Sequence, residues 1–163
     1  MSVLEANETG QNQSNVVGQA LWFFTHSFLA LIVWVGMMMA ITVLVRPTYL
    51  PPIITLAISA FIPFLAGFIL NKFRQDEIAT LVWLLGLIWF LCVGLWILDM
   101  PTGPNQCFRC DATQKLWLTF FSLSEDSGMI DGQGRLFGTW PAAALIGYSI
   151  GAKMGLNKQV EED

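Results

Sequence analysis

The stretch "IATLVWLLGLIWFLCVGLWIL", residues 78–98, contains no charged side chain over its whole length. A bilayer core about 30 Å thick is crossed by roughly 20 apolar residues in helical form. Because lipid offers no hydrogen bonds to the backbone, such a stretch has to be helical rather than irregular. Residues 78–98 therefore predict a transmembrane helix, and with it an integral membrane protein.

Three other intervals, residues 16–45, 47–71 and 136–152, also lack Asp, Glu, Lys and Arg. The whole chain is 55% hydrophobic and 12% charged, with a mean hydropathy of +0.58, whereas soluble proteins carry about 25% charged residues. The first two intervals are long enough to span. The last is short, but Lys153 can extend its usable length by reaching to the interface.

We therefore predict an all-α integral membrane protein, a four-transmembrane-helix bundle with one long polar loop between the third and fourth helices. The helices are expected at about 17–45, 52–70, 78–98 and 140–156, within one transmembrane domain over 16–156. Around them we expect a flexible polar N-terminal tail over 1–15, a loop over 99–135 and an acidic C-terminal tail over 157–163. The apolar segment 115–123 is too short to span, so a short interfacial helix is expected there.

Basic residues orient membrane proteins, since Lys and Arg collect on the cytoplasmic side. Here four basic residues fall on each side of the predicted bundle, but Lys72, Arg74 and Lys153 lie next to helix ends. This favours both termini on the cytoplasmic side and the loop 99–135 on the outer or lumenal side. The N-glycosylation sequons at Asn7 and Asn12 favour the opposite orientation in a eukaryote.

Cys107 and Cys110 form a C-x-x-C pair in the long loop. On an oxidising side they would form a structural disulfide. A redox centre is the alternative, because Arg109 between them favours a thiolate. The remaining cysteine, Cys92, has no mate to pass electrons on, and a structural zinc site needs about four ligands. We predict the disulfide, keep redox catalysis open, and predict no metal site.

His26 is the single histidine of the chain, so it cannot be one of two histidine ligands to a haem. It could still be the sole axial ligand of a pigment or complete a haem site with another subunit. An intramembrane histidine more commonly bonds to a neighbouring helix. No cofactor is therefore predicted, with a pigment or haem through His26 as the remaining option.

Ala143, Gly147, Gly151 and Gly155 recur at every fourth position of the last predicted helix. Such a glycine zipper makes a groove in which another helix backbone can approach closely. The sequence leaves open whether the partner helix belongs to this chain or to another subunit.

The predicted spans hold no Asp, Glu, Lys or Arg in their interiors, which disfavours a pump. A net charge of −4 disfavours nucleic acid as a partner. The leading interpretation is a non-enzymatic accessory or assembly subunit of a larger membrane complex, docking through the glycine zipper onto other membrane subunits or a second copy. The alternatives are a membrane thiol-disulfide oxidoreductase and a small oligomeric channel or carrier, whose polar pore would use Thr25, Ser27, Thr55 and Ser59.

Overall fold

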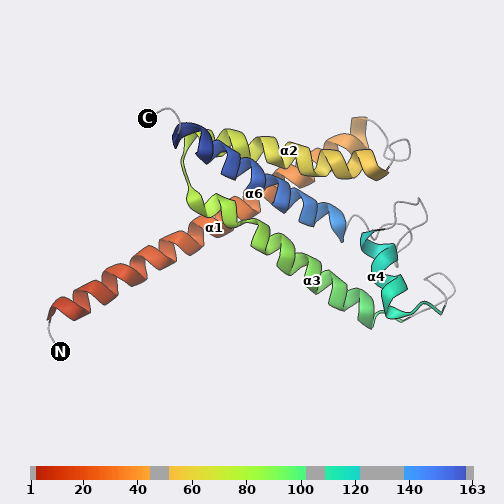
Figure 1. Ribbon diagram of the computed structural model, residues 1–163, viewed down its shortest axis with the longest axis horizontal. Coiled ribbons are helices and arrows are strands. Elements are labelled where there is room, and N and C mark those ends of the chain that lie inside the picture. The colour runs from red at the N-terminus through yellow and green to blue at the C-terminus, as the bar shows by residue number, and fades with distance from the viewer. Residues whose placement is uncertain (1–2, 45–51, 102–108, 122–137, 161–163) are drawn as a thin grey trace.

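A computed structural model describes residues 3–44, 52–101, 109–121 and 138–160, and these residues form helices and no strand. The helices are α1 (Val3–Leu44), α2 (Pro52–Phe73), the 3-10 helix η2 (Glu77–Leu81), α3 (Trp83–Asp99), α4 (Ala112–Phe120) and α6 (Thr139–Val160). Figure 1 shows α2 and α6 lying alongside each other while α3 diverges from them toward α4. The prediction of an all-α protein is confirmed.

Three helices are long and apolar enough to cross a membrane, namely Val16–Ile41, Ile53–Phe73 and Glu77–Asp99. They correspond to the first three predicted spans, and they support a multi-pass integral membrane protein. α6 covers the fourth predicted position as a helix, but it is not among the three. Its Gly, Ser, Tyr and Lys residues lower its hydropathy below that of the others.

α1 has 42 residues and is therefore about 63 Å long at 1.5 Å per residue, twice the hydrocarbon thickness. It begins at Val3, so residues 3–15 of the expected N-terminal tail are helical, and their flexibility stays a prediction. A physical reason is that extending an existing helix avoids the cost of nucleating a new one. The N-terminal half projects away from the other helices (Figure 1).

The third predicted helix is divided at its start. η2 covers Glu77–Leu81 as a 3-10 turn, Val82 connects it to α3, and α3 ends at Asp99. At the C-terminus, α6 continues to Val160, past the predicted end at 156, so residues 157–160 of the predicted acidic tail are helical. Residues 161–163 of that tail lie outside the described residues, as do residues 102–108 and 122–137 of the predicted loop.

α2 packs on α6 through small residues. On α2, a buried stripe with a spacing of four faces the interior, consisting of Thr55, Ser59, Pro63, Gly67 and Asn71. The stripe has little side-chain bulk at its centre, so the α6 backbone at Tyr148 and Ala152 comes close to Gly67. This is how membrane helices gain van der Waals contact without a hydrophobic driving force between them.

The main apolar core lies where α6 meets α1, η2 and the start of α3. Its fully buried members are Ala30, Ala79, Val82, Leu145, Tyr148 and Ala152. Gly86 of α3 closes this contact, since a Cβ there would lie 3.3 Å from the Leu145 Cβ atom. α6 is therefore the central helix of the described structure, although it is the least hydrophobic of the four long ones.

α4 forms a second, smaller core with the C-terminal half of α3. The Phe90 and Phe120 rings lie 4.1 Å apart between centroids, and Val93 and Ile97 are buried beside them. The Lys115 Nζ donates to the carbonyls of Leu98 at 3.3 Å and Met100 at 2.5 Å. A cation at a helix C-terminus is favourable because it meets unpaired carbonyl oxygens and the negative end of the dipole. The short helix predicted over 115–123 is found at Ala112–Phe120, three residues earlier.

Candidate functional site

A cluster of polar side chains joins α1, the α2–η2 connection and α6 at one end of the structure. His26 of α1 is 8% exposed, and Tyr148 of α6 is fully buried. The His26 Nδ1 and the Tyr148 hydroxyl share a hydrogen bond of 2.8 Å. The His26 Nε2 lies 3.5 Å from the Asp76 Oδ2. Both ring nitrogens of His26 therefore face groups of the same chain.

Asp76 also pairs with Arg74, whose Nε lies 3.7 Å from the same Oδ2 atom. The Arg74 guanidinium carbon lies 3.8 Å from the centre of the Trp22 ring on α1. Guanidinium groups bind aromatic faces through the ring quadrupole. The connection after α2 therefore holds α1 by two contacts, one to His26 and one to Trp22.

Asn71, near the end of α2, fixes the conformation of the connection between α2 and η2. Its side chain is 1% exposed, its Nδ2 donates to the Ala152 carbonyl at 2.7 Å, and its Oδ1 accepts from the Asp76 backbone N–H at 2.8 Å. A buried amide satisfied at both ends is strongly preferred over an unpaired one. Asn71 therefore places Asp76 against His26 and also ties α2 to α6.

This cluster links α1, α6 and the α2–η2 connection through a hydrogen bond and ion pairs. Among the described residues no group of three His, Cys, Asp or Glu side chains could hold a metal ion. An axial bond from His26 to a pigment or haem would have to replace either the Tyr148 or the Asp76 contact. The Asp76 carboxylate lies between Arg74 and His26, so both of its ion-pair partners belong to the same chain.

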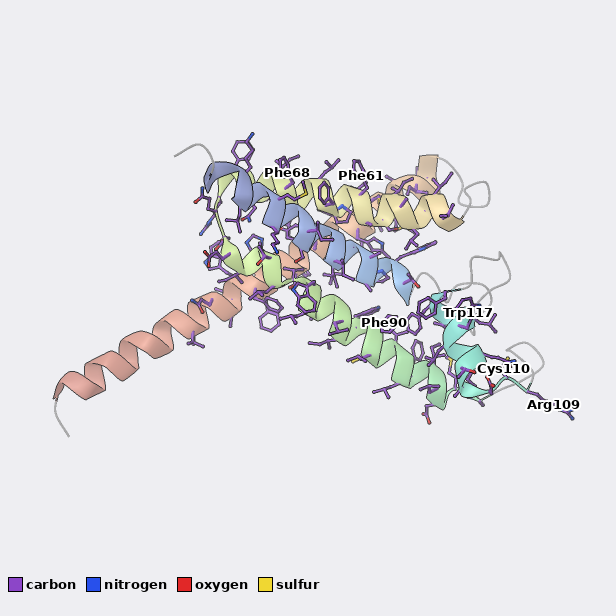
Figure 2. All side chains as sticks on the ribbon, in the orientation of Figure 1. Phe61, Phe68, Phe90, Arg109, Cys110 and Trp117 are labelled. Atoms are coloured by element: carbon purple, nitrogen blue, oxygen red, sulfur yellow. The ribbon has the colours of Figure 1, made fainter. Side chains whose placement is uncertain are left out.

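The glycines predicted to form a zipper, Gly147, Gly151 and Gly155 of α6, lie against α2 of the same chain. A Cβ atom built at Gly147 would overlap the Ala60 carbonyl oxygen, one at Gly151 would overlap the Phe64 carbonyl oxygen, and one at Gly155 would lie 2.9 Å from the Phe68 carbonyl oxygen. The pairs advance in the same direction along both helices, so α2 and α6 are parallel. Ala143, one step earlier, is half-buried. Figure 2 shows Phe61 and Phe68 on α2, beside α6.

Of the predicted C-x-x-C site, the structure describes only Arg109 and Cys110. Cys107 lies outside the described residues, so its pairing with Cys110 stays a prediction, as does redox activity. Cys110 is half-buried, and Arg109 has a φ of 62°, the left-handed conformation that non-glycine residues adopt mainly in tight turns. Figure 2 shows Arg109 and Cys110 at the start of α4, with the Arg109 side chain pointing away from the helices. Cys92 is a free, exposed thiol on α3.

Asp111 caps the N-terminus of α4, outside the spanning helices. Its Oδ1 accepts from the Gln114 backbone N–H at 2.8 Å and from the Thr113 hydroxyl at 2.9 Å. These two hydrogen bonds favour the carboxylate and hold the pKa of Asp111 below its ordinary value of 3.8. The cap therefore stabilises α4 above about pH 3.8 and is lost as the pH falls through the lowered pKa.

Replacing Asp111 by alanine is expected to open the first turn of α4 at neutral pH, because the Gln114 N–H loses its acceptor. Amide hydrogen exchange of residues 112–115 should rise in the variant. In the wild-type chain the same amides should show faster opening only at pH values below the ordinary Asp pKa. The substitution Gln114→Ala, which keeps the backbone N–H, serves as the control. Equal protection in Asp111→Ala and wild type would show that the cap contributes nothing.

Sequence reasoning found His26 but none of its partners. Arg74 and Asp76 stand in the charged connection "NKFRQDE", and Tyr148 stands within the zipper sequence "GYSIGAKMG". Each stretch has a visible feature: Asp76 is a charged residue next to a helix end, and Tyr148 is an aromatic hydroxyl among small residues. Neither feature identifies a partner without the packing of α6 against α1.

Comparison of the chain with protein-family models, with curated proteins and with solved structures finds no match.

Proposed function

We propose that this chain is a non-enzymatic accessory or assembly subunit of a larger membrane complex. The observation that carries the proposal is that the chain itself buries only a small part of each candidate spanning helix. In each of the three candidate spans, 22% of the apolar window is buried inside the structure. α3 diverges from α2 and α6 (Figure 1), and most of its residues are exposed. Most of this surface is available to lipid or to other membrane proteins.

The docking face is assigned to the outer side of α3 rather than to the glycine zipper. α2 already occupies Gly147, Gly151 and Gly155, and a helix from another subunit could not take its place without unpacking the chain. On α3, Trp89 is 39% exposed, Trp96 is 50% exposed, and Cys92 between them is exposed. Residues at i, i+3 and i+7 share one helix face.

The depth of Trp89 supports a protein partner at this face. Trp89 stands near the middle of the span Glu77–Asp99, whereas tryptophan in lipid-facing positions collects at the two membrane interfaces. Large aromatic side chains are also the residues that contribute most at protein interfaces. The occupant we propose is an apolar transmembrane helix of another protein. Under this proposal α6 is the fourth span, with its Lys153 end at the same membrane face as the His26 cluster.

The polar groups support a structural rather than a catalytic chain. His26, Asn71 and Lys115 are each bonded within the described structure. Two of the four hydroxyls expected to line a pore are bonded within their own helix: Thr25 donates to the Leu21 carbonyl and Ser27 to the Phe23 carbonyl, both at 2.8 Å. The Ser59 hydroxyl is buried and has no hydrogen-bond partner among the described residues. The bonds of Thr25 and Ser27 lend no support to a channel.

A matched pair of substitutions tests the docking face. Cys92→Trp adds an indole to the outer side of α3, and Ala57→Trp adds the same group to an exposed position of α2. With an affinity tag on the chain and extraction in mild detergent, Cys92→Trp should lower the amount of co-purifying membrane protein about tenfold, which corresponds to about 1.4 kcal/mol. Ala57→Trp should leave it unchanged. Equal recovery of partners with both variants contradicts the assignment.

A further inference from the structure

We infer that the groove between η2 and α6 is a binding site for a phospholipid whose headgroup carries a primary ammonium, as in phosphatidylethanolamine. The groove has a volume of about 680 Å³, and its polar lining includes Glu77 and Thr80 on one wall and Lys153 on the other. Its apolar lining includes Leu81, Ile146 and Ile150. The inference does not depend on the proposed function, because it concerns a different face of the chain.

The two walls of the groove, η2 and α6, run in opposite directions. The lining residues can therefore be ordered by their depth in the membrane. Ser149 donates to the Thr80 carbonyl, and further along α3 a Cβ at Gly86 would lie 3.3 Å from the Ala142 carbonyl oxygen. α6 is thus antiparallel to η2 and α3. Glu77 is the first residue of its candidate span, so Glu77 and Lys153 lie at the membrane surface. The apolar residues follow toward the interior.

The groove is lined toward the membrane interior by Ile146, which lies beside Gly86 of α3. Its sides remain open to lipid, since Leu81 is 46%, Ile150 51% and Ile146 43% exposed. A groove that is polar at the surface, apolar below and open sideways matches a phospholipid with its headgroup between Glu77 and Lys153. Its acyl chains would then lie along Ile150 and Ile146.

The charges of the groove select the headgroup. Within the described residues the ion pairs are those of Asp76 with His26 and Arg74, so neither Glu77 nor Lys153 is neutralised by a described side chain. Lys153 can bind the lipid phosphate, and Glu77 can accept hydrogen bonds from a primary ammonium. A choline headgroup has no N–H to donate to Glu77, and an anionic glycerol headgroup places no cation beside it. The site therefore favours the ethanolamine headgroup over both.

Lipid retention by the full chain tests this inference. The chain is reconstituted into vesicles of equimolar phosphatidylethanolamine, phosphatidylcholine and phosphatidylglycerol with identical acyl chains, extracted in mild detergent, and examined by native mass spectrometry. The wild type should retain phosphatidylethanolamine about three- to five-fold over each of the others, as expected for a partly exposed charge pair. Glu77→Gln should abolish this preference, and Lys153→Gln should lower retention of all three.

Two charge controls accompany these variants. Lys72→Gln removes an exposed lysine at the same end of the structure that does not line the groove, and Asp99→Asn removes an acid at the far end of α3. Both should keep the wild-type preference. Equal retention of the three lipids by the wild type, loss of all lipid by the wild type, or an unchanged preference in Glu77→Gln would each overturn the inference.

Discussion

Replacing Gly151 by leucine should separate α6 from α2 and lower the free energy of unfolding by about 3 kcal/mol, the upper end of the usual cost of overpacking. A side chain at position 151 would meet the Phe64 carbonyl group and, at 3.0 Å, the Phe68 backbone nitrogen. These are backbone atoms of a helix, so they cannot move aside as the end of a flexible side chain could. Thermal unfolding in mild detergent, followed by tryptophan fluorescence, measures the effect.

Gly36→Leu is the matched control, because a Cβ at Gly36 of α1 meets nothing within 4 Å. It should change the unfolding temperature little. Gly151→Ala should fall between the two variants, since a single methyl group demands a smaller displacement. If Gly151→Leu unfolded at the same temperature as Gly36→Leu, the close α2–α6 contact would be wrong.

The second large effect is expected at the polar cluster. His26→Phe keeps an aromatic ring of similar size but leaves the buried Tyr148 hydroxyl without its 2.8 Å partner. It also removes the contact to Asp76. A buried polar group left unsatisfied costs about 1 to 3 kcal/mol, so we expect a loss of about 2 kcal/mol of stability in the same unfolding assay.

A double-mutant cycle with Tyr148→Phe separates this bond from the rest of the cluster. If His26 and Tyr148 are bonded, the double variant should be more stable than the sum of the single effects implies, by about 1 kcal/mol. Thr25→Val, one residue away on α1 and exposed, is the control and should cost little. Strictly additive effects of His26→Phe and Tyr148→Phe would contradict the bond.

The spanning helices could be predicted from the sequence because charge-free length is a property of a single segment. Residues 78–98 and 52–70 predicted two of the candidate spans to within three residues. The ends were less accurate for a physical reason. The start of α1 at Val3 depends on extension of an existing helix into polar residues, and the division at Val82 depends on how η2 packs on α6.

The contacts between helices could be predicted only in part. The spacing of Gly147, Gly151 and Gly155 indicated a close packing face, but the stripe of α2 that carries Ser59 and Gly67 was not recognised. Its spacing of four is visible in the sequence, but spacing alone does not show which helix the stripe faces.

The polar cluster could not have been assembled from the sequence. His26 is 50 residues from Asp76 and 122 from Tyr148. No local pattern links residues so far apart, because their meeting depends on α6 returning to lie against α1. The same holds for the groove of Glu77 and Lys153, which two antiparallel elements create.

Site-specific photo-cross-linking in native membranes tests the proposed role as a subunit most directly. A photoreactive amino acid is placed at position 92, on the outer face of α3, and separately at position 57, on the exposed side of α2. We predict a discrete protein adduct from position 92, containing a different membrane protein, and only lipid adducts from position 57. Lipid adducts alone from both positions would contradict the account.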